Sequence, residues 1–406
     1  MTTPAADVLP LAGLRVLDVS TFIAAPAAAV VMADYGADVI KIEQPGEGDP
    51  NRRAVNFAAY PKSEVDYPWQ MDSRNKRSIA LDLKHDAGRA VFARLVESAD
   101  VMITNFPIPV RERNRIRYED VAAMNPRLVY ASLTGYGETG EERDAPGFDS
   151  TAYFARSGFL DVLRYEGQPP HFSLPASGDR ATAMALLSAV MIALYQREKT
   201  GRGMEVGTSL LASGLWSNGV HAQAALVGGF LPTRPPRDRP RSPLGNSYRT
   251  RDGRWFQIAL AVEEGPWPAL CKAVGRPELE NDPRFAETPI RRANSAELTA
   301  IFDAIFASQD LSYWRERLAA HRITYGVISR LEDLKDDAQA RAAGAVVPTE
   351  NAAMPFTIAA PIRLGTSKPR PARAAPRLGE QTDEILAEAG YDAGEIAMLR
   401  ASGAVA

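Results

Sequence analysis

The sequence predicts an α/β protein, with a Rossmann-like large domain built on a mostly parallel sheet and a smaller α+β domain. Three observations carry this prediction. Short apolar runs alternate with segments of helical periodicity over the first 210 residues. The 406-residue chain has an ordinary globular composition, 45% hydrophobic and 24% charged. A proline- and arginine-rich stretch at 231–243 (LPTRPPRDRPRSP) then interrupts the pattern.

The first half of the chain supplies the strands of the large domain. Segment 14–19 is a short apolar run typical of a buried parallel strand. The alanine-rich segment 24–35 is expected to be helical, because Pro26 suits a first helical turn and Gly36 ends the helix. Further helices are expected at 87–98 and 181–198, and further strands at 37–43, 78–83, 101–105, 128–132 and 205–210.

Repeated strand–helix units imply a parallel sheet that helices cover on both faces. In such sheets, ligands bind at the carboxyl ends of the strands. We therefore expect the binding site among the segments that follow Val19, Glu43, Leu83, Asn105 and Ser132.

The smaller domain follows the stretch at 231–243, which its prolines exclude from regular structure. A second proline- and arginine-rich stretch, 361–377, precedes a final helix from Thr382. We expect a split large domain (1–222 and 331–406) around a small domain with its linkers (223–330). Its expected strands are 255–260 and 324–329, and its expected helices are 267–274, 296–306 and 311–321.

Composition excludes several classes of protein. The formal net charge of −3 argues against a nucleic-acid binder. We find no run of about 18 apolar residues and no secretory signal, so we expect a cytoplasmic protein without a membrane partner. No metal site is expected, because the chain has one cysteine and no histidines at ligand spacing. Cys271 lies in an apolar helical segment, which favours core packing over a nucleophilic role.

Residues 135–140 (GYGETG) fit the dinucleotide-binding pattern G-x-G-x-x-G. That pattern requires a helix to open at the third glycine, and here two glutamates and Pro146-Gly147 follow. A flexible loop beside a site is favoured. An NAD(P)-dependent oxidoreductase stays open as a minor alternative.

Asp179 precedes a long amphipathic helix, and two interpretations stay open. As an N-cap it accepts backbone N–H bonds. Alternatively, the helix dipole keeps its carboxylate ionised, Gly178 allows close approach, and the carboxylate attacks an acyl carbonyl.

Several cations lie near predicted strand ends, where they could hold phosphates, although a solvated face is the commoner reason for each. These residues are Lys76, Arg77, Lys84, Arg111, Arg113, Arg115 and Arg117.

Several segments, in their order and spacing, resemble the class III CoA-transferases (CaiB/BaiF type). This family includes formyl-CoA transferase, the carnitine CoA-transferases and α-methylacyl-CoA racemase. The segments are 11–18 (LAGLRVLD), 35–46 (YGADVIKIEQPG), 75–84 (NKRSIALDLK), 99–106 (ADVMITNF), 125–137 (NPRLVYASLTGYG), 178–179, 200–203 (TGRG) and 378–382 (LGEQT).

The resemblance implies an enzyme that moves CoA from an acyl-CoA to a free carboxylic acid, without a permanently bound cofactor. It implies aspartyl anhydride and aspartyl-CoA thioester intermediates on Asp179, and an interlocked ring homodimer. The positions similar to the family's CoA contacts are Ile23, Ala24, Leu81, Asp82, Leu83, Lys84, Asn105, Phe106, Arg113, Thr134, Gly135, Tyr136 and Gly137. Tyr136 and Gly137 are expected to line the acyl site.

The departures from the family pattern narrow the reaction. The racemases carry a histidine where this chain has Phe148, and a phenyl ring cannot take a proton, which disfavours racemisation. Residues 22–26 and 103–107 are similar to the mesaconyl-CoA transferases, which points to a C4–C5 dicarboxylate. A racemase and a non-catalytic acyl-CoA binding module remain as alternatives.

Overall fold

The computed structural model describes residues 8–365 and 367–406. They form two compact units. The large unit holds the chain up to Asp161, Phe172–Gly229 and Ala340–Ala406, and the small unit holds Val162–His171 and Phe230–Gln339. The short segment 162–171 clusters with the small unit, where Tyr165 forms a parallel bridge with Arg234.

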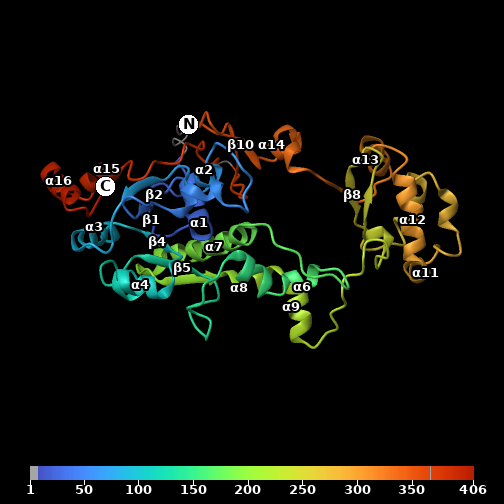
Figure 1. Ribbon diagram of the computed structural model, residues 1–406, viewed down its shortest axis with the longest axis horizontal. Helices are drawn as coiled ribbons and strands as arrows, with labels where there is room; N and C mark the ends of the chain where they lie inside the picture. The colour runs from blue at the N-terminus through green and yellow to red at the C-terminus, as the bar shows by residue number, and fades with distance from the viewer. Residues whose placement is uncertain (1–7, 366) are drawn as a thin grey trace. The chain divides into compact units, whose positions relative to one another are not determined.

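A six-stranded, wholly parallel sheet organises the large unit, in the order β3-β2-β1-β4-β5-β6 (Figure 1). This order is that of a doubly wound fold, with its switch point between β1 and β4. The parallel α/β prediction is thus confirmed, while the interlocked homodimer stays a prediction. The strands are β1 (Arg15–Asp18), β2 (Asp38–Glu43), β3 (Arg77–Ala80), β4 (Val101–Thr104), β5 (Val129–Thr134) and β6 (Glu205–Ser209).

Helices cover both faces of the sheet, and successive strand residues point to opposite sides. Val16 packs into the core under α1 and α7, while Leu17 packs into the core under α3 and α15. The helices in or bordering the large unit are α1 (Ala24–Asp34), α2 (Tyr67–Ser73), α3 (Asp86–Glu97), α4 (Ile108–Asn114), α5 (Tyr118–Ala122), α6 (Phe159–Leu163), α7 (Ser177–Thr200), α8 (Leu210–Ser217), α9 (Gly219–Leu226), α14 (Ala338–Ala342), α15 (Thr382–Glu388) and α16 (Ala393–Ala401).

Strand β3 ends earlier than the sequence predicts. The end of the chain returns to this edge: Leu81 forms an antiparallel bridge with Val405, and the Asp82 N–H donates to the Ala404 carbonyl at 2.9 Å. The predicted strand segment 81–83 is therefore an isolated bridge and a turn, and it is wrong as a strand.

A buried ion network lies at the carboxyl ends of β1 and β2. The Nζ atoms of Lys76 and Lys41 lie 2.7 Å and 3.4 Å from the two carboxylate oxygens of Asp18. All three side chains are fully buried. Two lysines on one carboxylate lower the pKa of Asp18, although burial alone would raise it.

The small unit is an α+β assembly around an antiparallel sheet in the order β7-β8-β9. Phe256 and Phe306 pack edge to face at 4.9 Å between ring centroids in its core. Cys271 is fully buried there, as expected, and burial raises its pKa to about 12. Its elements are β7 (Ser247–Arg249), β8 (Trp255–Ile258), β9 (Tyr325–Ile328), α10 (Trp267–Ala273), α11 (Thr288–Ala293), α12 (Ser295–Phe306) and α13 (Leu311–Ala320); a hairpin of β10 (Val346–Pro348) and β11 (Phe356–Ile358) follows in the large unit.

Helix α7 is long and apolar enough to cross a membrane by length and composition alone. It packs in the core of the large unit instead, where Leu186 and Val190 are fully buried. Figure 1 shows α7 beside α1, which it contacts.

Candidate active site

A cavity of about 250 Å³ opens at the switch point of the large unit, at the carboxyl ends of β1, β4 and β5. This is the edge at which the sequence predicted ligand binding. Its walls are segments 21–24, 105–108, 133–135 and 143–148, with Asp179 from α7 and Leu210 from α8. Six of the predicted CoA contacts lie in this lining beside the predicted nucleophile: Ile23, Ala24, Asn105, Phe106, Thr134 and Gly135.

The start of α1 forms one wall. Among the described residues no side chain caps this helix. Its N-terminal end, at Ile23 and Ala24, lines the cavity. Uncapped N–H groups at a helix start favour an anion such as a phosphate. The preceding residue, Phe22, has a positive φ of 61°, and its N–H donates to Asp49 Oδ1 at 3.0 Å.

Asn105 holds this wall to the one that follows β4. Its Nδ2 donates to the Thr21 carbonyl at 2.8 Å, and its Oδ1 accepts from the Thr21 N–H at 2.8 Å. The amide thus pairs with both backbone groups of one residue. Asn105 therefore fixes the loop after β1 in addition to lining the cavity.

The glycine motif forms a braced loop with no helix after it. A Cβ atom on Gly135 would lie 3.0 Å from the Gly147 Cα, so the backbones of the two segments around Gly135 and Gly147 are in direct contact. Glu138 ties the loop down, since Oε1 accepts from Arg111 Nη2 at 2.9 Å and from Ser132 Oγ at 2.7 Å. Close backbone packing explains Gly135, whereas Gly137 and Gly140 have positive φ values of 113° and 90°; none of the three opens a dinucleotide-binding helix.

Asp179 lies in the first turn of α7, as the third helical residue, and it does not cap the helix. The N-cap interpretation is therefore wrong. Asp149 takes that role from 29 residues upstream: its Oδ2 accepts from the Gly178 N–H at 3.3 Å. The ring of Tyr153 is the group that approaches Gly178, so close that a Cβ atom there would lie 2.6 Å from its Cγ.

The charge on Asp179 also differs from the expectation. Burial and the nearby carboxylate of Asp149 raise its pKa from 3.8 to about 7, against the influence of Arg180. The expectation of a permanently ionised carboxylate is wrong, because the helix end does not outweigh these effects. A carboxyl pKa raised by burial and a neighbouring carboxylate in a cavity is typical of a functional site.

Most of the predicted phosphate cations are engaged elsewhere. Arg77 begins β3, at the opposite edge of the sheet, and contacts Asp38 and Glu388 at 2.6 Å and 2.8 Å. Its assignment to a phosphate cluster is wrong. Lys76 is buried against Asp18, Arg111 pairs with Glu138, and Arg117 pairs with Asp120. Lys84, Arg113 and Arg115 are exposed.

The remaining predicted contacts lie outside the cavity lining. They are Leu81, Asp82, Leu83, Lys84, Arg113, Tyr136 and Gly137. Leu81 and Leu83 are buried, and Tyr136 packs against the core under α1. Their roles toward CoA stay predictions.

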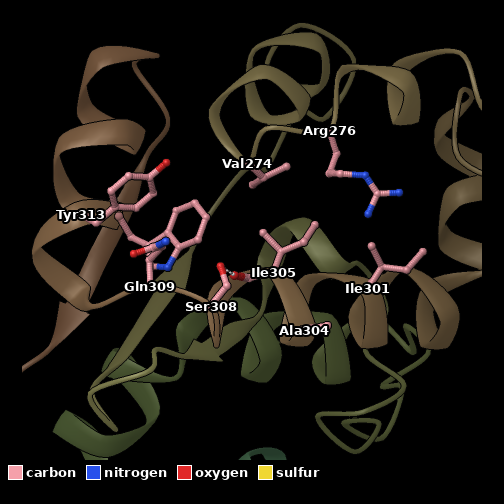
Figure 2. A pocket seen from close by; sticks show the side chains of 9 residues that line it. Val274, Arg276, Ile301, Ala304, Ile305, Ser308, Gln309 and Tyr313 are labelled. Atoms are coloured by element: carbon pink, nitrogen blue, oxygen red, sulfur yellow. Dashed lines mark hydrogen bonds between the residues drawn. The ribbon is translucent and has the colours of Figure 1, made fainter.

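A second hollow, of about 470 Å³, lies in the small unit between α10, α12 and α13. Figure 2 shows its largely apolar lining, with Arg276 and Tyr313 on opposite sides. Arg276 pairs with Glu278, and Trp314 donates its ring N–H to the Phe306 carbonyl. This lining lacks a carboxylate nucleophile, so the chemistry is assigned to the large unit.

Sequence reasoning missed three features of the site. Asp149 caps α7, Arg180 pairs with Asp72, and Phe148 lines the cavity. The first two join residues far apart in the chain, so no local pattern reveals them. Phe148 was visible only as a departure from a motif.

The fold and the site define a doubly wound α/β enzyme that carries a titratable aspartate in its ligand-binding crevice. Residues 11–382 match CoA-transferase family III, and the chain belongs to that family. It is a family III CoA-transferase, as the relatives also indicate.

The chain is 31% identical to the (R)-2-hydroxy-4-methylpentanoate CoA-transferase of Clostridioides difficile, covering 94% of this chain and 96% of that one. It is 30% identical to the succinyl-CoA:glutarate CoA-transferase of Mus musculus, covering 98% and 90%. Among solved structures, a CaiB/BaiF family protein from Brucella suis superposes with a TM-score of 0.84 at 29% identity, covering 94% and 99%. The family resemblance in the sequence is thus confirmed.

Proposed function

We propose that the protein moves CoA from an acyl-CoA thioester to a free carboxylic acid through covalent intermediates on Asp179. The observation that carries this proposal is the Asp179 carboxyl group in the cavity at the strand ends, beside the uncapped start of α1. The helix start offers a site for an anionic group and Asp179 offers a nucleophile, and their place on the walls of one cavity supports the binding of an anionic substrate beside the nucleophile.

The steps balance without ATP, a metal or a redox partner. An Asp179 oxygen attacks the thioester carbonyl carbon and the C–S bond breaks. CoA leaves as a thiolate, and Asp179 and the donor acyl group are joined as a mixed anhydride. The thiolate attacks the aspartyl carbonyl and releases the donor carboxylate, which leaves an aspartyl-CoA thioester. The acceptor carboxylate forms a second anhydride and expels the thiolate, which then attacks the acceptor acyl carbon and frees Asp179. One thioester replaces another, so the exchange is near thermoneutral.

We propose a C4–C5 dicarboxylic acid as one of the two acids. The similarity of segments 22–26 and 103–107 to mesaconyl-CoA transferases and the relative named for glutarate support this choice. Phe148 in the cavity lining supports transfer over racemisation, because the phenyl ring offers no base there.

Intact-mass spectrometry after incubation with acetyl-CoA, succinyl-CoA and glutaryl-CoA tests the proposal. We expect a mass increase on wild-type protein that hydroxylamine removes and that Asp179→Ala lacks. Turnover of Asp179→Ala should fall at least about a thousandfold. Near-normal turnover in a folded Asp179→Ala protein would refute the mechanism, and a monocarboxylate-only adduct would refute the dicarboxylate assignment.

We also propose a homodimer. Consecutive helices α8 and α9 carry highly exposed apolar side chains, among them Trp216, Val220 and Leu226, at 88%, 83% and 81% exposure. Several highly exposed apolar side chains on two consecutive helices are typical of an interface.

A further inference from the structure

Two carboxylates and one guanidinium lie close enough to Asp179, in the first turn of α7, to influence its charge. Asp149 lies at the helix start, Asp72 comes from α2, and Arg180 follows Asp179 in the chain. The same charges act on Tyr60, since burial and the carboxylates of Asp179, Asp149 and Asp72 raise the pKa of Tyr60 to about 12. Among the groups that shift the pKa of Asp179, Arg180 is the cation, and it lowers that pKa.

The cavity wall also carries Arg143 and Asp144. Their side chains pair with each other at 3.2 Å, and both are about half exposed. Solvent therefore screens both charges, and neither residue is among the groups that shift the pKa of Asp179.

Arg180 is anchored at a buried position. Its Nη1 forms an ion pair with Oδ1 of Asp72, whose side chain is fully buried, while the Arg180 side chain is one-third exposed. The other oxygen of Asp72 accepts from Asn51 Nδ2 at 3.3 Å. Both carboxylate oxygens of Asp72 are therefore held, so its position on α2 is fixed.

The same contacts continue to the opposite wall of the cavity. The Asn51 N–H donates to Asp49 Oδ1 at 2.9 Å, and that oxygen also accepts from the Phe22 N–H at 3.0 Å. Asp49 Oδ2 lies 2.8 Å from Lys41 Nζ. A chain of buried polar contacts thus runs from Phe22, beside the start of α1, to Arg180, beside Asp179.

We propose that Arg180, anchored by Asp72, is a positioning residue that favours the charged form of Asp179, which is the form that attacks the thioester. This inference rests on the proposed function for its catalytic consequence only. Burial and two neighbouring carboxylates favour the neutral acid, and a fixed guanidinium opposes them. An arginine that could turn into solvent would stabilise the charged form of Asp179 only weakly. The ion pair with the buried Asp72 prevents this.

The ionisation of Asp179 can be measured without any substrate. The infrared carboxyl band lost on Asp179→Asn substitution, followed against pH, gives the midpoint for that one group. We expect Arg180→Met to raise the midpoint by about one pH unit, as follows from removal of a nearby opposite charge. Arg180→Lys should restore most of the shift. Arg400→Met, which removes an exposed arginine on α16 paired with Asp383, should leave it unchanged.

Asp72→Asn separates anchoring from simple charge. Loss of the Asp72 charge alone would lower the midpoint of Asp179, whereas release of Arg180 raises it. We expect a rise. A fall would overturn the anchoring role, and an unchanged or lowered midpoint in folded Arg180→Met would overturn the inference as a whole. Arg180→Gln serves if the Met variant fails to fold.

The rate of adduct formation then links ionisation to reaction. Using whichever of the three acyl-CoAs labels the wild type, the Arg180→Met rate should be about tenfold lower well below the midpoint and should recover at high pH. A structural defect would instead lower the rate at every pH, which would contradict the proposal. Wild-type protein that forms no adduct would refute the proposed function, whereas the infrared midpoints still decide whether Arg180 sets the charge.

Discussion

In the folded protein, burial and Asp149 raise the pKa of Asp179 from the ordinary carboxyl value of 3.8 to about 7. Only the ionised form attacks a thioester, so turnover should rise with pH through about 7. The raised pKa also means that the folded state binds this proton more tightly than the unfolded state. Its contribution to stability is therefore full below about pH 4 and is lost as pH rises to about 7.

Asp179→Asn tests both consequences, because an amide stays neutral at every pH. We expect its melting temperature to match the wild type near pH 4 and to exceed it above pH 7, while activity is lost. Calorimetry over this range measures the difference. A variant that is less stable than wild type at pH 8 would contradict the raised pKa.

Asn105 is the second residue whose contacts make a clear prediction. Asn105→Ala removes both bonds to Thr21, which should lower the free energy of unfolding by about 1–3 kcal/mol. Loss of the loop brace should also raise the KM for acyl-CoA, about tenfold, more than it lowers kcat. Asn281→Ala, at an exposed site in the small unit, is the matched control. Equal effects of the two variants would argue against the brace.

At the scale of elements, the start of α7 depends on the packing of its backbone against η2, a π-helix over Asp149–Ala155. Gly178→Ala would place a methyl group 2.6 Å from Tyr153 Cγ. We expect a loss of about 1–3 kcal/mol in stability, because a well-packed site must shift to admit it. Displacement of Asp179 should also lower kcat. Gly265→Ala is the control, since a Cβ atom there meets nothing within 4 Å; urea unfolding and turnover of both variants decide the matter.

Strands β1, β2 and β3 meet at the ion network of Asp18, Lys41 and Lys76. Lys76→Met leaves the buried Asp18 carboxylate with one lysine, 3.4 Å away, and removes the bond to the Pro26 carbonyl. We expect a loss of about 3–5 kcal/mol in the free energy of unfolding. Lys62→Met, at an exposed position, should change stability by less than about 0.5 kcal/mol. Chemical denaturation compares them, and a stable Lys76→Met protein would show that Lys41 alone neutralises Asp18.

The sequence was sufficient for the sheet because its central strands β1, β4 and β5 are largely buried, so consecutive apolar residues signal each of them. It was insufficient for short helices such as α2 and α11, whose few turns hold little periodicity. Strand β3 was predicted too long because its pairing partner after Ala80 is the far end of the chain. Pairing across that separation leaves no local signal.

At the scale of the whole molecule, the location of the site followed from topology, whereas its electrostatics did not. Parallel strands deliver their carboxyl ends to one edge, so the segments after Val19 and Asn105 could be placed together in advance. The charge on Asp179 depends on burial and on Asp149 and Asp72, which α2 and η2 bring from other parts of the chain. Arg77 is the opposite case: its place next to a strand suggested that it binds a ligand, but it pairs with Asp38 and Glu388 of the same chain.

The exposed apolar side chains of α8 and α9 make a prediction about the assembly. Trp216 is 88% exposed and Val220 is 83% exposed in the single chain, and a large apolar surface in water is unfavourable. We expect light scattering to give twice the chain mass for the wild type. Trp216→Glu places a charge on this surface and should weaken the dimer at least about tenfold, since a buried unpaired charge is strongly unfavourable. Met398→Glu adds the same charge on an exposed methionine of α16 and should leave the dimer intact. A wild type that stays monomeric at every concentration, or a Trp216→Glu protein as dimeric as the control, would show that α8 and α9 do not form the interface.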